Sequence, residues 1–204
     1  MSQWENVIRH RQWQQGLSSL EMLEITHKTV GIVGLGHVGL QVAQRLKGFD
    51  TRTIYYDIDE IPMETQEKLD VQPVPLEQLF EESDIVTLHV PLTRSTRGLV
   101  SHRLLELMKP TAYLINTSRG QVVDEKALYQ ALKEKRIAGA ALDVMEQEPP
   151  SKDNLLLQLD NIIITPHLAG SSLETFLRAA DFAYSNIERV LAGKPPQSVV
   201  TAED

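Results

Sequence analysis

The sequence contains no cysteine, which excludes disulfide bonds, thiolate nucleophiles and cysteine-ligated metal sites. Basic residues are fewer than acidic ones, with 20 Lys and Arg and 28 Asp and Glu. The resulting formal net charge of −8 disfavours nucleic-acid binding. No apolar run reaches membrane-spanning length, and the N-terminal residues MSQWENVIRHRQWQQ lack the apolar core of a secretory signal. We therefore expect a cytoplasmic protein that binds neither nucleic acid nor membrane. No spacing of histidines and carboxylates suggests a metal site.

What the chain does contain is a regular alternation of strand-like and helix-like segments after residue 28. Six apolar, β-branched runs predict buried strands at 29–34, 51–57, 84–90, 112–118, 137–144 and 161–166. Helical stretches lie between them at 38–47, 75–82, 101–108 and 124–135. This order predicts an α/β protein with a doubly wound parallel sheet.

Two further helices are predicted at the ends of the chain. Ser171 and Glu174 have the spacing of a capping box, and apolar residues then recur on one helical face as far as Leu191. Near the N-terminus, residues 3–15 predict a polar helix that carries Trp4 and Trp13, which we interpret as core or subunit-interface anchors.

The first strand runs into a glycine turn, GLGHVG, at residues 34–39. Gly34 permits a tight turn, Gly36 lets the backbone approach a pyrophosphate, and Gly39 lets the following helix pack on the strand. The helix N-terminus offers free N–H groups to phosphates. The pattern predicts a Rossmann-type dinucleotide site, and the alternative is a glycine turn that serves packing alone.

An acidic residue, Asp57, follows the second strand 18 residues after Gly39. A carboxylate at this position accepts hydrogen bonds from the ribose hydroxyls of adenosine. Asp59 and Glu60 follow without an arginine to receive a 2′-phosphate, so the sequence favours NAD over NADP. The alternative is that Asp57 merely ends its strand.

Three polar residues, Arg119, Glu148 and His167, each follow a predicted strand and can therefore meet at one edge of the sheet. Histidine suits acid–base catalysis near neutral pH, a carboxylate orients it, and an arginine grips a substrate carboxylate. Together they predict reduction of a 2-keto acid. Taken singly, Arg119 could instead pair with Asp124, Glu146 could replace Glu148, and His167 could be structural.

With these motifs the chain resembles the D-isomer-specific 2-hydroxyacid dehydrogenase family, in its nucleotide-binding domain. The matching strings cover Lys28 to Gly170: GLGHVG, HVPLTRSTRG, INTSRGQVVDEKAL, IAGAALDVMEQEPP and NIIITPHLAG. The resemblance implies that Arg119 binds substrate, that Glu148 pairs with His167, and that His167 donates and accepts the proton. It further implies that Asp143 contacts the nicotinamide carboxamide.

The resemblance and the glycine turn together nominate a set of residues along the NAD site. These are Gly34, Gly36, His37, Val38, Gly39, Asp57, His89, Val90, Pro91, Thr117, Ser118, Asp143, Ala169 and Gly170. His37 departs from the family, in which many members carry arginine beside the pyrophosphate. The side chain of His89 is expected to be structural, while the backbone of its loop faces the cofactor.

The expected division is a linker helix at 1–27, an NAD-binding domain at 28–193 and a crossover tail at 194–204. In the family a substrate domain is assembled from both ends of the chain, and nothing here corresponds to its N-terminal portion. We therefore expect NADH binding with little turnover by this chain.

The expected function is interconversion of a D-2-hydroxy acid and a 2-keto acid, of the phosphoglycerate or glyoxylate/hydroxypyruvate type, by a homodimer. The alternatives are a non-catalytic NAD(H) sensor and a dimerising module.

Overall fold

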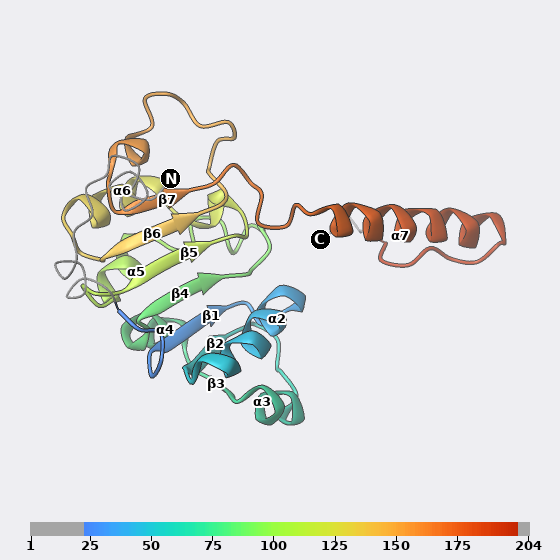
Figure 1. Cartoon of the computed structure of the whole chain (residues 1–204), viewed down its shortest axis with the longest axis horizontal. Helices are drawn as coiled ribbons and strands as arrows, with labels where there is room; N and C mark the ends of the chain where they lie inside the picture. The colour runs from blue at the N-terminus through green and yellow to red at the C-terminus, as the bar shows by residue number, and fades with distance from the viewer. Residues whose placement is uncertain (1–22, 200–204) are drawn as a thin grey trace, which may run out of the picture.

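Strand β1 (Thr29–Val33) is buried along its whole length and lies inside a seven-stranded sheet. The computed structural model describes residues 23–199. Its strand order is β3-β2-β1-β4-β5-β6-β7, and each neighbouring pair is parallel. The other strands are β2 (Arg52–Tyr56), β3 (Val71–Pro73), β4 (Ile85–Leu88), β5 (Tyr113–Asn116), β6 (Gly139–Leu142) and β7 (Ile162–Ile164). The predicted doubly wound parallel fold is confirmed (Figure 1).

Helices cover the two faces of the sheet unequally. One face packs against α4 (Leu76–Glu82), α5 (His102–Leu107) and α6 (Glu125–Lys133), and this layer forms the larger apolar core. On the other face, α2 (His37–Leu46) and α3 (Met63–Leu69) cover the strands of the β1–β3 half. Short 3-10 turns lie at Lys47–Phe49, Gly120–Val122 and Leu155–Gln158.

The structure adds two elements that the sequence did not predict. Helix α3 buries only Leu69 among its seven residues, so it has almost no apolar periodicity. Strand β3 is three residues long, contains Pro73 and lies at the edge of the sheet, where a missing N–H is tolerated. Both elements are too short and too polar for an apolar pattern to reveal them.

The last helix, α7 (Leu173–Leu191), begins one residue later than the expected capping box requires. Ser172, not Ser171, is its N-cap, and its Oγ accepts a hydrogen bond from the backbone N–H of Thr175 at 3.1 Å. Ser171 instead donates its N–H to the carbonyl of Leu168 and so belongs to the preceding turn. The prediction of Ser171 as the cap is therefore wrong.

Helix α7 extends away from the sheet, and none of its 19 residues is buried by the part of the chain described (Figure 1). After it, residues 194–199 turn back, and Asn186 and Gln197 exchange two hydrogen bonds. The predicted N-terminal helix at 3–15 lies outside the described residues, and residues 23–27 contain a turn rather than a helix. Between residues 23 and 199, no helix is long and apolar enough to cross a membrane.

Candidate active site

The glycine turn connects β1 to α2 and has the geometry expected of each glycine. Gly34 has φ of +91°, a conformation that side chains disfavour. A Cβ on Gly39 would lie 2.2 Å from the carbonyl oxygen of Gly34, so only glycine permits this approach of helix and strand. A Cβ on Gly36, the N-cap of α2, would meet nothing within 4 Å. The backbone of Gly36 therefore borders open space at a helix N-terminus, where a pyrophosphate would fit.

Asp57 follows β2 and reaches the glycine turn. Its Oδ2 accepts a hydrogen bond from the N–H of Leu35 at 2.6 Å, and its Oδ1 accepts one from the N–H of Asp59 at 3.0 Å. The carboxylate thus lies against the turn rather than merely ending the strand. His37 and Val38 are exposed in the first turn of α2 beside it.

The loop after β4 packs on the same turn. A Cβ on Gly34 would lie 2.9 Å from the carbonyl carbon of His89, whose N–H donates to the carbonyl of Val33 at 2.7 Å. The His89 ring turns back toward its own strand, with Nε2 3.0 Å from Oγ1 of Thr87. Burial lowers the pKa of His89, which favours the neutral ring. The loop backbone contacts the turn while the side chain is held by its strand.

Arg119 is presented by a short loop after β5, and the buried Asn116 shapes that loop. The side-chain oxygen of Asn116 accepts hydrogen bonds from the N–H and the Oγ of Ser118, and its amide donates to the carbonyl of Arg119 at 2.9 Å. The guanidinium is exposed and donates to the carbonyl of Ser118. Asp124 caps α6 instead of pairing with Arg119. Asn116 was not among the predicted site residues, although an asparagine at the end of a buried run is a recognisable turn signal.

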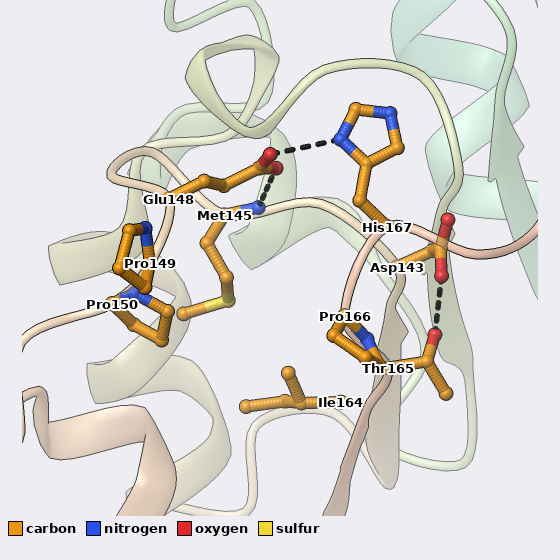
Figure 2. Close-up of a pocket in the computed structure, with 9 residues that line it drawn as sticks. All are labelled: Asp143, Met145, Glu148, Pro149, Pro150, Ile164, Thr165, Pro166 and His167. Carbon is orange, nitrogen blue, oxygen red and sulfur yellow. Dashed lines mark hydrogen bonds and ion pairs between the residues drawn. The ribbon is translucent and has the colours of Figure 1, made fainter.

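Glu148 and His167 form a hydrogen-bonded pair. Nδ1 of His167 lies 2.8 Å from Oε2 of Glu148, whose other oxygen accepts the N–H of Met145 at 3.0 Å (Figure 2). The hydrogen bond from His167 is the main cause of a lowered pKa of Glu148, with further contributions from the Met145 N–H and the charge of Arg119. A carboxylate accepts only, so Nδ1 carries the proton and Nε2 stays free for a substrate.

The loops that carry Arg119 and Glu148 touch through their backbones. A Cβ on Gly120 would lie 1.9 Å from the carbonyl carbon of Met145, so no other residue fits there without a shift. Gln121 donates to the carbonyl of Glu146 at 2.7 Å. The N–H of Glu146 is held by the carboxylate of Glu125. Glu148 rather than Glu146 is thus the residue that reaches His167.

Asp143, directly after β6, fixes the turn that carries His167. Its carboxylate accepts hydrogen bonds from Oγ1 of Thr165 and from the N–H groups of Leu168 and Ala169, the latter two at 2.8 Å. Its carbonyl accepts the N–H of His167, which has φ of 54°. Burial acts to raise the pKa of Asp143, but these hydrogen bonds outweigh it, and the net pKa is lowered. Asp143 therefore supports the unusual backbone conformation of the histidine.

Known proteins resemble this chain over the residues that form the site. A family model described as D-isomer specific 2-hydroxyacid dehydrogenase, NAD binding domain, matches residues 1–169. The chain belongs to this family. A glyoxylate reductase of Korarchaeum cryptofilum is 47% identical over 202 residues, which cover 98% of this chain and 60% of that protein. A D-3-phosphoglycerate dehydrogenase of Methanocaldococcus jannaschii is 45% identical over 179 residues, covering 87% of this chain and 34% of that one.

Solved structures share the fold of this chain. An acyclic imino acid reductase in complex with NADPH and D-Arg superposes with a TM-score of 0.87 at 34% identity, covering 97% of this chain and 62% of the other. The chain thus spans between 34% and 62% of the length of these proteins and comprises the NAD-binding domain of the family.

In this family member the nominated residues gather along one edge of the sheet. Each candidate catalytic residue follows a parallel strand: Arg119 follows β5, Glu148 follows β6 and His167 follows β7. Toward β1 the same edge carries the glycine turn, Asp57, and the loop from His89 to Pro91. Thr117 and Ser118 follow β5, and Ala169 and Gly170 follow the histidine. The topology alone therefore brings the predicted site together.

A cleft of about 350 Å³ opens beside the histidine–glutamate pair. Its remaining walls are mainly apolar, formed by Met145, Pro149, Pro150, Ile164 and Pro166 (Figure 2). The side chains of His167 and Glu148 are themselves 50% and 40% exposed at this cleft, so water screens the charge interaction between them. Within residues 23–199, no group of three or more acidic or histidine residues could hold a metal ion.

Proposed function

We propose that this chain is the cofactor-binding part of an NAD-dependent dehydrogenase that interconverts a 2-keto acid and a D-2-hydroxy acid of the glyoxylate type. The observation that carries the proposal is the 2.8 Å pair between His167 and Glu148, on a loop in contact with the one that presents Arg119. The relatives named glyoxylate reductase and D-3-phosphoglycerate dehydrogenase support this substrate class.

Each of the three side chains has a distinct part in the proposed reaction. The exposed Arg119 guanidinium binds the substrate carboxylate through paired hydrogen bonds. His167 holds the substrate carbonyl oxygen through Nε2 and protonates it as the alcohol forms. Glu148 keeps the ring oriented and stabilises the positive charge of the imidazolium before the proton leaves. NADH, when bound, would supply the hydride that the carbonyl carbon accepts.

The residues of the glycine turn fit a dinucleotide. The open space at Gly36 leaves room for a pyrophosphate, and the α2 N-terminus offers it N–H donors. Asp57 is placed for the adenosine ribose, with Asp59 and Glu60 following it. A 2′-phosphate would meet three carboxylates there, so we propose that the chain prefers NADH to NADPH.

The decisive experiment compares His167→Ala with the unchanged chain in two assays. We expect NADH fluorescence titration to give nearly the same affinity for both proteins, because the ring is not part of the cradle. Glyoxylate reduction by the unchanged chain should be slow, since the described site is open to water, and His167→Ala should lower it by about 10²-fold or more. His102→Ala is the matched control, because it removes an exposed histidine on α5 and should change neither assay.

Two other functions remain as outcomes of this test. The exposed apolar face of α7 favours a dimerising module, and the partial coverage of the relatives favours a non-catalytic NAD(H) sensor. NADH binding without any histidine-dependent turnover would indicate a non-catalytic sensor. Failure to bind NADH would indicate a dimerising module. Assembly into a homodimer, a cytoplasmic location and the domain limits at residues 27 and 193 remain predictions.

A further inference from the structure

The loop that carries Glu148 has little packing of its own. Residues 143–154 connect β6 to the 3-10 turn Leu155–Gln158 without forming a helix or a strand. Residues 146–149 within this loop are all exposed, so the burial of their side chains contributes little to holding them. The position of the Glu148 carboxylate therefore depends on the polar contacts of the loop.

One carboxylate, that of Glu125, bridges the two ends of this loop. Glu125 is the first residue of α6, and its Oε1 accepts a hydrogen bond from the backbone N–H of Glu146. Its Oε2 accepts a hydrogen bond from the side-chain amide of Asn154 at 3.0 Å. Glu125 does not serve as the cap of its own helix, because Asp124 has that role. Both oxygens of Glu125 thus bind the loop.

Asn154 ties the far end of the loop to the apolar core. Its Oδ1 accepts the backbone N–H of Leu156 at 3.0 Å, and Leu156 is buried in the larger core. The amide of Asn154 that binds Glu125 is therefore held by a fixed point of the fold. Through this contact the core restrains the carboxylate that holds the near end of the loop.

The near end of the loop is fixed to the segment that presents Arg119. Gln121 donates a hydrogen bond to the carbonyl of Glu146, and Glu125 accepts the N–H of the same residue. Both backbone polar groups of Glu146 are thus held by one short segment, which begins with Arg119. Glu148 lies only two residues after Glu146. The contacts of Glu125 and Gln121 therefore set where Glu148 lies relative to Arg119.

We propose that Glu125 is a positioning residue that acts through Glu148. In the proposed function, on which this inference rests for its substrate, one small molecule contacts both Arg119 and His167. Glu148 orients the His167 ring through the 2.8 Å hydrogen bond at Nδ1 (Figure 2). Glu125 keeps this pair in register with Arg119, and a displacement of about 1 Å between such groups lowers a rate by up to about 10²-fold.

The chemistry of the contact suggests a test in which donor and acceptor are exchanged. Glu125→Gln preserves the shape of the side chain but leaves it one acceptor oxygen and one donor amide. The variant side chain cannot accept from Glu146 and Asn154 together, so one end of the loop is released. Adding Asn154→Asp supplies a carboxylate that accepts from the new amide, which restores both contacts. It also keeps an oxygen for the N–H of Leu156.

The tautomer of the His167 ring reports the position of Glu148 without any turnover. We expect ¹⁵N NMR of histidine-labelled protein at about pH 9, where an imidazole is neutral, to show mainly the Nδ1–H form in the unchanged chain. In Glu125→Gln the fraction of the Nε2–H form should rise severalfold. Asn154→Ala releases the far end of the loop without altering α6, and it should shift the tautomer in the same direction. His167→Ala identifies the signals of the ring.

The paired substitution and a matched control separate positioning from a general loss of stability. Glu125→Gln combined with Asn154→Asp should return the tautomer of His167 to that of the unchanged chain. Glu134→Gln is the control, because it neutralises an exposed carboxylate at the other end of α6 and should leave the tautomer unchanged. The proposal is overturned if neither Glu125→Gln nor Asn154→Ala changes the tautomer, or if the paired substitution does not restore it.

Glyoxylate reduction provides the second readout. Glu125→Gln should lower kcat by about tenfold with a smaller change in KM, because Arg119 still binds the substrate carboxylate. The affinity for NADH should stay the same, and the paired substitution should restore kcat. A tautomer that responds as expected in a chain without His167-dependent turnover would support the role of Glu125 and contradict the proposed function. His167-dependent turnover that is unaffected by Glu125→Gln would support the proposed function and overturn the role of Glu125.

Discussion

At the scale of single residues, the backbone around His167 depends on Asp143 more than on any contact of the imidazole itself. The carboxylate accepts three hydrogen bonds from Thr165, Leu168 and Ala169, and it is only 6% exposed. A buried carboxylate with three donors is stabilised in its ionised form. The position of the proposed proton donor therefore depends on a charge located on the neighbouring strand end.

This arrangement predicts how stability depends on pH. Because the folded-state pKa of Asp143 is lowered, its ionised form stabilises the fold above the unfolded-state pKa, and this stabilisation is lost as the pH falls through the folded-state pKa. Asp143→Asn should lower the free energy of unfolding by about 2 kcal/mol at neutral pH. The difference should shrink as the pH falls below about 4. Urea unfolding at a series of pH values measures it.

The matched control for this experiment is Asp153→Asn, which neutralises an exposed carboxylate. It should leave the free energy of unfolding nearly unchanged at every pH. A difference between Asp143→Asn and the unchanged chain that stayed constant from neutral to acid pH would contradict the role of the charge.

Two glycines of the turn, Gly36 and Gly39, make a second prediction at this scale. Gly36→Ala adds a methyl group that meets no protein atom, so the free energy of unfolding should change by less than about 1 kcal/mol. The same methyl group occupies the space of a pyrophosphate, and NADH affinity should fall by about tenfold or more. Gly39→Ala should instead destabilise the fold by about 2 kcal/mol, because its methyl group collides with the carbonyl of Gly34.

Gly48→Ala supplies the control, since its methyl group also meets nothing and lies away from the turn. Calorimetry and NADH titration on the three variants separate packing from binding. If Gly36→Ala bound NADH as well as the unchanged chain, the dinucleotide would not lie over this turn.

At the scale of elements, the start of α7 shows that the preceding turn determines which residue is the N-cap. Two adjacent serines precede the helix, and the one that caps it is set by the turn after His167, which uses the N–H of Ser171. Ser172→Ala should therefore reduce the helicity of residues 173–191, with a local cost of about 1 kcal/mol. Ser171→Ala should not. Circular dichroism of the two variants compares them under identical conditions, and equal losses of helicity would disprove the assignment.

The elements that could be predicted from sequence are those with strong local signals. Strand β1 and helix α2 were expected because an apolar run, a glycine turn and an amphipathic pattern agree. Helix α3 and strand β3 escaped because each buries a single residue. Their positions depend on packing at the edge of the sheet, which local sequence does not encode.

For the candidate site, the sequence predicted which residues lie at the site better than it predicted the contacts that those residues make. Arg119, Glu148 and His167 were nominated because each follows a strand, and parallel strands bring their ends together. The choice of Glu148 over Glu146 becomes visible only in three dimensions, where Glu146 is held from the other side by Glu125. Asn116 was missed because its partners are Ser118 and the carbonyl of Arg119, in the turn that it creates.

At the scale of the whole molecule, the apolar face of α7 has no cover among residues 23–199. Leu173, Phe176, Leu177, Tyr184, Ile187 and Leu191 are all exposed, although they recur at the spacing of a core-facing helix. Most of the stability of a helix in a protein comes from tertiary packing of its apolar face. Relatives are longer than this chain, which spans 60% of the Korarchaeum cryptofilum glyoxylate reductase and 34% of the Methanocaldococcus jannaschii D-3-phosphoglycerate dehydrogenase. A helix that packs within a longer assembly would explain the pattern.

Hydrogen exchange tests whether α7 is covered in the chain itself. In dilute solution we expect peptides from residues 173–191 to exchange orders of magnitude faster than peptides from β1, because opening α7 exposes no buried side chain. Peptides from β1 should approach the protection of global unfolding, since every residue of that strand is buried. Protection of α7 that appears only at high protein concentration would show that two copies pair through this helix, and the proposed homodimer would then form there. Equal protection of α7 and β1 at all concentrations would contradict the exposed state of the helix, because a covered apolar face must open together with the element that covers it.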